Sequence, residues 1–110
     1  MLKKDQTRFV DLQDVGCLPC RIKGFGCVPG DVHHLVEGRK RLGNDYTICL
    51  CPWHHRGIPP TGLDVRQAEE IAGPSLARNK KAFYDAFGSE KDLLETTNQA
   101  LEIIQQSKVG

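Results

Sequence analysis

The sequence predicts a small α+β domain, and three features of the chain support this fold class. Two short runs rich in β-branched residues, 31–35 and 46–50, flank a charged segment that contains glycine, as the strands of an antiparallel hairpin do. Apolar residues recur at helical spacing before and after this hairpin. All five cysteines lie in the first half of the 110-residue chain, so the two halves differ in chemistry.

The hairpin is expected to follow a helix and a loop. Residues 5–15 have the apolar spacing of a short amphipathic helix, which Gly16 can end. Residues 16–30 are rich in glycine and proline, and they predict a loop without regular structure. Directly after the second strand, Pro52 suits the first turn of a short helix over 52–56, because proline has no amide hydrogen to leave unsatisfied.

Three further helices are expected in the second half of the chain. Asp64 can cap a helix over 65–72, and a Gly-Pro pair closes it. A second helix covers about 80–87. Ser89 starts the longest helix with a Ser-x-x-Asp capping box, and apolar residues form a stripe along it.

The cysteines favour metal ligation over disulfide bonds. No apolar run follows the N-terminal lysines, and no stretch approaches the length of a membrane span, so no membrane association and a cytosolic location are expected. Disulfides are rare in that compartment, and an odd number of cysteines fits a disulfide framework less well.

Two pairs of residues have the spacing of zinc ligands. Cys17 and Cys20 are separated by two residues, as are Cys51 and His54, and a tight turn lets such a pair grip one tetrahedral ion. Together they predict one structural Cys3His zinc site, with two ligands before the hairpin in the sequence and two after it. The alternative is a buried cluster of free thiols.

Two cysteines remain outside this set. Cys49 lies on the same strand face as Cys51 and can compete for the ion, but Cys51 alone has the two-residue spacing to His54. Cys27 is expected to be a small buried hydrophobic residue, as free cysteine usually is.

All four histidines lie in two adjacent pairs, His33-His34 and His54-His55. Neighbours on a strand point to opposite faces, so His33 and His34 must have different roles, and His55 is turned about 100° from His54 on a helix. One strand histidine and one helix histidine can hold a second metal, while the other strand histidine activates water for phosphodiester hydrolysis. The alternative is two unrelated zinc or core sites in a non-catalytic finger.

The charge is unevenly divided along the chain. The first sixty residues hold nine Lys/Arg against six Asp/Glu, a net +3, and the rest hold six against eight, a net −2. Arg39, Lys40 and Arg41 fall between the two histidine pairs, and Arg56 follows the second, so these four are candidate nucleic-acid-binding residues. The alternative for the basic segment is a solvated loop.

These motifs resemble the zinc-containing HNH (ββα-metal) endonucleases, and more closely the phage and prophage recombination-enhancement nucleases that cut DNA in a RecA-dependent way. The second half of the chain is also similar to that group, although less specifically. One departure is Cys49, where such sequences commonly have proline. The motifs that carry the resemblance are Cys17-x-x-Cys20, Val32-His33-His34-Leu35 and Thr47-Ile48-Cys49-Leu50-Cys51-Pro52-Trp53-His54-His55-Arg56.

The resemblance implies a role for each histidine outside the zinc set. It implies that His33 and His55 are ligands of a catalytic metal and that His34 is the general base. The Cys3His set matches the family's structural zinc. The asparagine of the motif, which orients the base through the backbone of its loop, corresponds to Asn44 or to Asp45, and the spacing does not decide between them.

Taken together, residues 1–110 are expected to form one HNH nuclease domain, with a zinc-stabilised, treble-clef-like ββα-metal core at about 14–60 and a helical extension at about 63–108. The expected activity is hydrolysis of DNA phosphodiesters to a 3′-hydroxyl and a 5′-phosphate. The catalytic ion is Mg²⁺ or another divalent metal such as Mn²⁺, Ni²⁺ or Zn²⁺. DNA and a RecA filament in a bacterial host are the implied partners. The competing hypothesis is a non-catalytic zinc finger, which has no need for three further histidines.

Overall fold

The computed structural model describes residues 3–37 and 40–109, and it confirms the predicted α+β class. Within these residues, no helix is both long and apolar enough to cross a membrane. The elements in chain order are α1 (Lys3–Val15), α2 (Leu18–Ile22), β1 (Asp31–His34), β2 (Val36–Glu37), β3 (Lys40–Arg41), β4 (Thr47–Leu50), α3 (Pro52–Arg56), α4 (Val65–Ala72), α5 (Lys80–Phe87) and α6 (Glu90–Val109).

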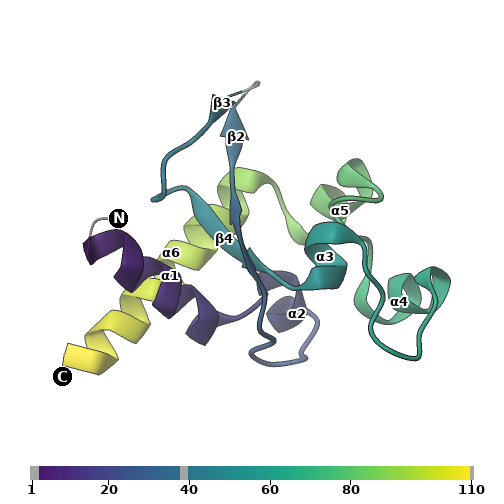
Figure 1. Ribbon diagram of the computed structural model, residues 1–110, viewed down its shortest axis with the longest axis horizontal. Coiled ribbons are helices and arrows are strands. Elements are labelled where there is room, and N and C mark those ends of the chain that lie inside the picture. Colours follow the sequence, from purple (N-terminus) through teal and green to yellow (C-terminus); the bar gives the residue numbers. More distant parts are fainter. Residues whose placement is uncertain (1–2, 38–39, 110) are drawn as a thin grey trace.

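The predicted antiparallel hairpin is present and is longer than expected. Strands β1 and β4 pair with His33 opposite Ile48 and His34 opposite Thr47. The segment between them was expected to be a loop, but part of it forms a second antiparallel pair, β2 with β3. The Leu35 N–H donates to the Tyr46 carbonyl at 2.9 Å, so pairing continues past the end of β1. The β2–β3 pair projects from the body of the molecule (Figure 1).

The predicted helix boundaries of α3, α4, α5 and α6 are confirmed, and local signals explain them. Pro52 occupies the first turn of α3, and Gly57 ends that helix at φ 71°, a left-handed conformation that favours glycine. Asp64 accepts a hydrogen bond from the Gln67 amide in a capping box at the start of α4. Ser89 forms the expected reciprocal hydrogen bonds with Asp92 before α6.

Two predictions for residues 16–30 are wrong. The segment is not entirely a loop, because Leu18–Ile22 form the short helix α2, in which proline occupies the first turn and Leu18 is buried. Cys27, in the loop after α2, is exposed and not buried.

The hairpin packs between two apolar clusters. Because strand side chains alternate, Val32 and Cys49 face the cluster formed with α1 and α6, while Ile48 faces the other cluster. The helices after residue 62 cover the apolar cluster that contains Ile48, as expected, and contribute to it the buried side chains of Phe83 and Leu93.

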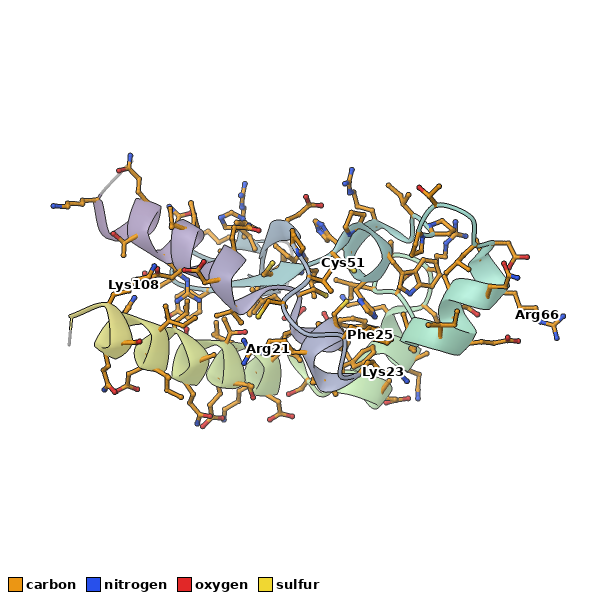
Figure 2. The ribbon with its side chains drawn as sticks, turned by 90° about the horizontal axis from the view of Figure 1, so that it is seen from below. Arg21, Lys23, Phe25, Cys51, Arg66 and Lys108 are labelled. Atoms are coloured by element: carbon orange, nitrogen blue, oxygen red, sulfur yellow. The ribbon has the colours of Figure 1, made fainter. Side chains whose placement is uncertain are left out.

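Helices α1 and α6 lie side by side, with Lys108 between them (Figure 2). The Lys108 ammonium contacts Asp11 at 2.5 Å and Asp14 at 3.0 Å. Asp11 is almost fully buried, so this ion pair holds the end of α6 against α1.

Candidate functional site

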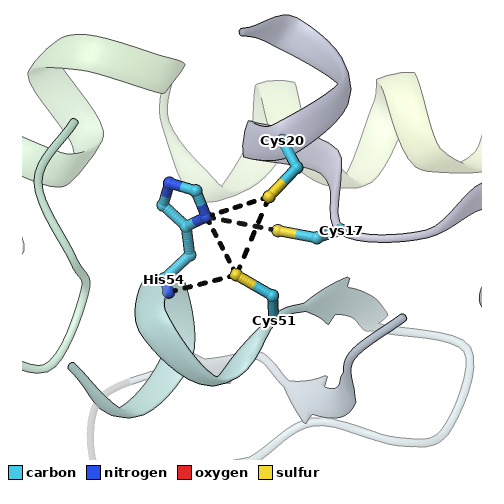
Figure 3. Close-up of side chains that lie close together, drawn as sticks. All are labelled: Cys17, Cys20, Cys51 and His54. Atoms are coloured by element: carbon cyan, nitrogen blue, oxygen red, sulfur yellow. Dashed lines mark hydrogen bonds between the residues drawn. The ribbon is translucent and has the colours of Figure 1, made fainter. Parts of the chain in front are cut away.

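The four predicted zinc ligands come together at the start of α2 and at the junction of β4 with α3 (Figure 3). The Nδ1 atom of His54 lies 3.4 Å from the sulfur of Cys17, 3.5 Å from that of Cys20 and 3.2 Å from that of Cys51. The sulfurs of Cys20 and Cys51 are 3.7 Å apart. All four residues are buried.

These separations fit the coordination of one tetrahedral ion. Zinc binds cysteine sulfur at about 2.3 Å and histidine nitrogen at about 2.0–2.1 Å, so neighbouring ligands of a tetrahedral site lie about 3.5–3.8 Å apart. The four separations given above, 3.2 to 3.7 Å, are close to these values, and all four ligand atoms lie within 4.8 Å of one another. The cluster can therefore hold a structural metal ion.

Neighbouring contacts determine which nitrogen of His54 carries the proton, and they shift the pKa values of the cysteines. The Nε2 atom of His54 lies 2.8 Å from the carbonyl of Ala72, to which it donates, so Nδ1 carries the lone pair that faces the sulfurs. Hydrogen bonds from Cys17 and Cys20 hold the pKa of Cys51 well below its ordinary value. Contacts with Cys17 and Cys51 raise the pKa of Cys20.

Cys49 does not join this set. Its side chain is buried in the cluster formed with α1 and α6, beside Leu12 and Val15. Burial raises the pKa of the Cys49 thiol to about 12. The competition expected from strand alternation does not arise, because Cys51 lies at the N-cap of α3, where the chain has turned out of the strand.

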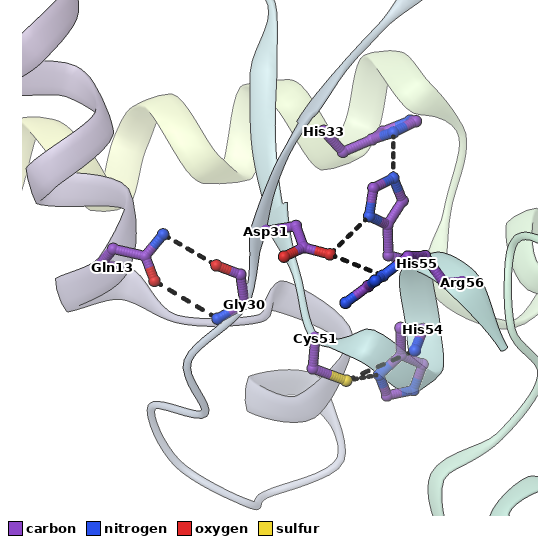
Figure 4. Close-up of polar contacts among 8 residues, drawn as sticks. All are labelled: Gln13, Gly30, Asp31, His33, Cys51, His54, His55 and Arg56. Atoms are coloured by element: carbon purple, nitrogen blue, oxygen red, sulfur yellow. Dashed lines mark hydrogen bonds and ion pairs between the residues drawn. The ribbon is translucent and has the colours of Figure 1, made fainter. Parts of the chain in front are cut away.

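A second group of polar side chains joins His33 of β1 to His55 of α3 (Figure 4). The Nδ1 atom of His33 lies 3.2 Å from the Nε2 atom of His55. At metal–nitrogen distances of about 2.1 Å, two ligands of one ion lie about 3.0 Å apart at a right angle and about 3.4 Å apart at the tetrahedral angle. The two nitrogens therefore fit a shared divalent ion.

Asp31 orients this pair from the first residue of β1. Its Oδ2 atom lies 3.1 Å from Nδ1 of His55 and 3.1 Å from Nε of Arg56. A carboxylate only accepts, so Nδ1 of His55 donates and Nε2 keeps its lone pair toward His33. The side chain of Gln13 forms two hydrogen bonds with the backbone of Gly30 and so fixes the chain just before Asp31.

The neutral form of His33 is strongly favoured. Burial and the neighbouring His55 lower the pKa of His33 to about 4. A metal ligand must be deprotonated, so His33 is ready to bind an ion at neutral pH.

His34 lies on the opposite side of β1, as strand alternation predicts. Its Nε2 atom lies 3.0 Å from Oδ1 of Asn44. The guanidinium NH2 of Arg41 lies 2.6 Å from Nδ1 of His34 and 3.1 Å from Nε2. Asn44, one of the two candidates for the motif asparagine, thus contacts the predicted base. Burial lowers the pKa of Arg8, and the nearby carboxylate of Asp45, the other candidate, partly offsets this effect.

The candidate nucleic-acid-binding residues occupy different settings. Lys40 and Arg41 are exposed on β3, at the projecting end of the hairpin. Arg56 pairs with Asp31 beside the His33–His55 pair. Arg39 lies outside the described residues. Lys40 and Arg41 are therefore carried by the same hairpin as His33 and His34.

Sequence reasoning missed the partners that hold the histidines. Asp31 directly precedes the motif, and its position at the start of a predicted strand was a usable signal. Asp5 and Arg8 of α1 contact Asn44 and Thr47 across 39 residues, and nothing local in the sequence indicates these contacts.

Comparison with known proteins agrees with the motifs. A family model described as "Recombination enhancement, RecA-dependent nuclease" matches residues 3–102, which include both clusters and most of α6. No curated protein and no solved structure matches the chain.

Proposed function

Because the chain belongs to the family of recombination-enhancement, RecA-dependent nucleases, we propose that it cuts DNA at an HNH-type, metal-dependent site formed by His33, His34 and His55. The observation that carries this proposal is the 3.2 Å separation of the His33 and His55 nitrogens, beside His34 on the same strand. Mg²⁺, Mn²⁺, Ni²⁺ or Zn²⁺ are the candidate ions. A divalent ion bound there would offset the negative charge that builds up on the phosphate and on the leaving oxygen.

In this proposal His34 is the general base. Its unprotonated ring nitrogen takes a proton from water, the water oxygen forms a new bond to phosphorus, and the bond from phosphorus to the 3′ oxygen breaks. The 3′ oxygen takes a proton from solvent, so the products are a 3′-hydroxyl and a 5′-phosphate. Asn44 holds the His34 ring through its Oδ1 atom, and Asp31 holds the His55 ring.

We also propose that the Cys3His cluster binds structural zinc. Its donors are three sulfurs and one imidazole nitrogen, a set typical of closed tetrahedral zinc sites. The projecting basic hairpin would contact the phosphate backbone, and a RecA filament in a bacterial host, of phage or prophage origin, is the proposed context.

A plasmid-nicking assay with a series of divalent metals, with and without a RecA filament, tests the proposal. His34→Ala should retain zinc content, thermal stability and DNA affinity, yet lose at least about 10²-fold in cleavage rate at every metal concentration. Val36→Ala, a change at a half-exposed residue of the same hairpin, is the matched control and should cut normally. Wild-type cleavage by pure His34→Ala would contradict the mechanism and favour the non-catalytic zinc finger.

A further inference from the structure

Helix α1 holds the turn that carries Asn44 at two points. The Nδ2 atom of Asn44 donates to Oδ2 of the buried Asp5 at 3.3 Å. Arg8 donates to both the hydroxyl and the carbonyl of Thr47, at 2.8 and 2.7 Å, and the Thr47 hydroxyl donates to the Asn44 carbonyl at 2.8 Å. Asp5 thus fixes the Asn44 side chain while Arg8 fixes the backbone around it.

Asp5 determines which way the Asn44 amide points. A carboxylate can only accept hydrogen bonds, so the Nδ2 end of the amide faces Asp5 and the Oδ1 end faces His34. An amide oxygen also only accepts, so the Nε2 atom of His34, 3.0 Å away, must carry the ring proton. The lone pair is then on Nδ1. The shorter of the two Arg41 contacts, 2.6 Å to Nδ1, requires the same tautomer because arginine only donates, whereas the 3.1 Å contact to Nε2 is not a hydrogen bond in this tautomer. The Arg41 side chain would have to leave Nδ1 before that nitrogen could take a proton from water.

We propose that Asp5 is a positioning residue for DNA cleavage, which through Asn44 holds His34 in the tautomer with its lone pair on Nδ1. This inference rests on the proposed function, in which His34 accepts a proton from water. Without Asp5 the amide can rotate by about 180° and present Nδ2 to His34, an arrangement that favours the opposite tautomer and moves the lone pair to the wrong nitrogen.

The kinetic test compares Asp5→Ala, Asp5→Asn and a matched control, Asp11→Asn. Asp11 is also a buried carboxylate on α1, but it contacts Lys108 and Gln105 of α6. Asp5→Ala should lower kcat by about tenfold or more with KM for DNA within about twofold, since positioning acts on the chemical step. Asp5→Asn retains an acceptor and should recover part of the rate. Asp11→Asn should lower only the melting temperature.

A double-mutant cycle and a spectroscopic measurement separate positioning from general stability. In the Asn44→Ala background, Asp5→Ala should cause no further loss of kcat, because the two residues act in series. In ¹⁵N-histidine NMR spectra of the zinc-loaded protein, His34 should be the Nε2–H tautomer in the wild type and lose that preference in Asp5→Ala.

Several results would overturn the inference. An unchanged tautomer in Asp5→Ala excludes the proposed route, and so does an additive loss with Asn44→Ala. An equal fall in kcat for Asp11→Asn would show that Asp5 acts only through stability. If Asp5→Ala does not fold, Asp5→Asn carries the test through its kcat and its His34 tautomer. Normal cleavage by His34→Ala would instead contradict the proposed function, while the tautomer result would still decide whether Asp5 orients His34.

Discussion

Replacing Asp31 should weaken metal binding at the proposed His33–His55 site without affecting the proposed base, His34. Its Oδ2 atom is the acceptor for Nδ1 of His55, and it pairs with Arg56 at the same distance of 3.1 Å. Loss of such an outer-sphere carboxylate typically costs about 10–100-fold in metal affinity, or about 1.4–2.7 kcal/mol. Asp31→Ala removes the acceptor and should show the larger effect, whereas Asp31→Asn keeps a neutral acceptor and should show the smaller one.

The assay is plasmid nicking as a function of divalent metal concentration. The half-saturating concentration should rise about 10–100-fold, while the rate at saturation should stay close to that of the wild type. Stability should change little, because the Asp31 side chain is 41% exposed and exposed ion pairs contribute only about 0–1 kcal/mol. Asp14→Asn, which breaks a comparably exposed pair with Lys108, is the control and should leave the metal dependence unchanged. A half-saturating concentration unaltered in Asp31→Ala would refute the reasoning.

Four other outcomes can be checked. We expect about one zinc ion per chain, and its removal by a chelator should unfold the N-terminal half, because zinc-binding energy is folding energy in a small domain. Circular dichroism measures this unfolding, and a folded zinc-free protein would contradict the prediction. Lys40→Ala and Arg41→Ala should each reduce the slope of log affinity for DNA against log salt by about one unit, whereas an unchanged slope would assign them to a solvated loop. Glu95→Lys with Glu102→Lys should alter co-sedimentation with RecA filaments if the acidic face of α6 contacts them, and equal co-sedimentation would exclude that face. Burial raises the pKa of Tyr84 above its ordinary value of 10, so the unfolded state loses its proton first and the free energy of unfolding should fall as pH rises past about 10. Urea unfolding at pH 8 and 10.5 should show a smaller fall in Tyr84→Phe, and an equal fall would contradict the assignment.

The parts of the fold that could be predicted from the sequence depend on local chemistry. Asp64 and Ser89 mark the starts of helices because their side chains accept hydrogen bonds from backbone amides three residues later. Pro52 is compatible with only the first turn of a helix. The ligand set was predictable because Cys-x-x-Cys and Cys-x-x-His spacings describe the geometry of a turn around an ion.

The parts that could not be predicted depend on long-range packing. Helix α2 forms in a segment rich in glycine and proline because Leu18 is buried there, and burial is not a local property. The choice between Asn44 and Asp45 depends on which side chain meets His34, and in the structure Asn44 does so while Asp5 holds its other end. The exposure of Cys27 likewise depends on where the loop after α2 lies relative to the core.

The pairing of α1 with α6 has a consequence for the order of assembly during synthesis. Asp11 receives hydrogen bonds from Gln105 and Lys108, which follow it by 94 and 97 residues, and Arg8 donates to Asn98, 90 residues later. Contacts of such high sequence separation form late, and the ribosome adds residues at only about 5–20 per second. The helix that supports Asn44 and His34 gains its partner only when α6 emerges. A nascent chain in which α6 has not yet been made therefore lacks the α1–α6 contacts that hold this helix in place.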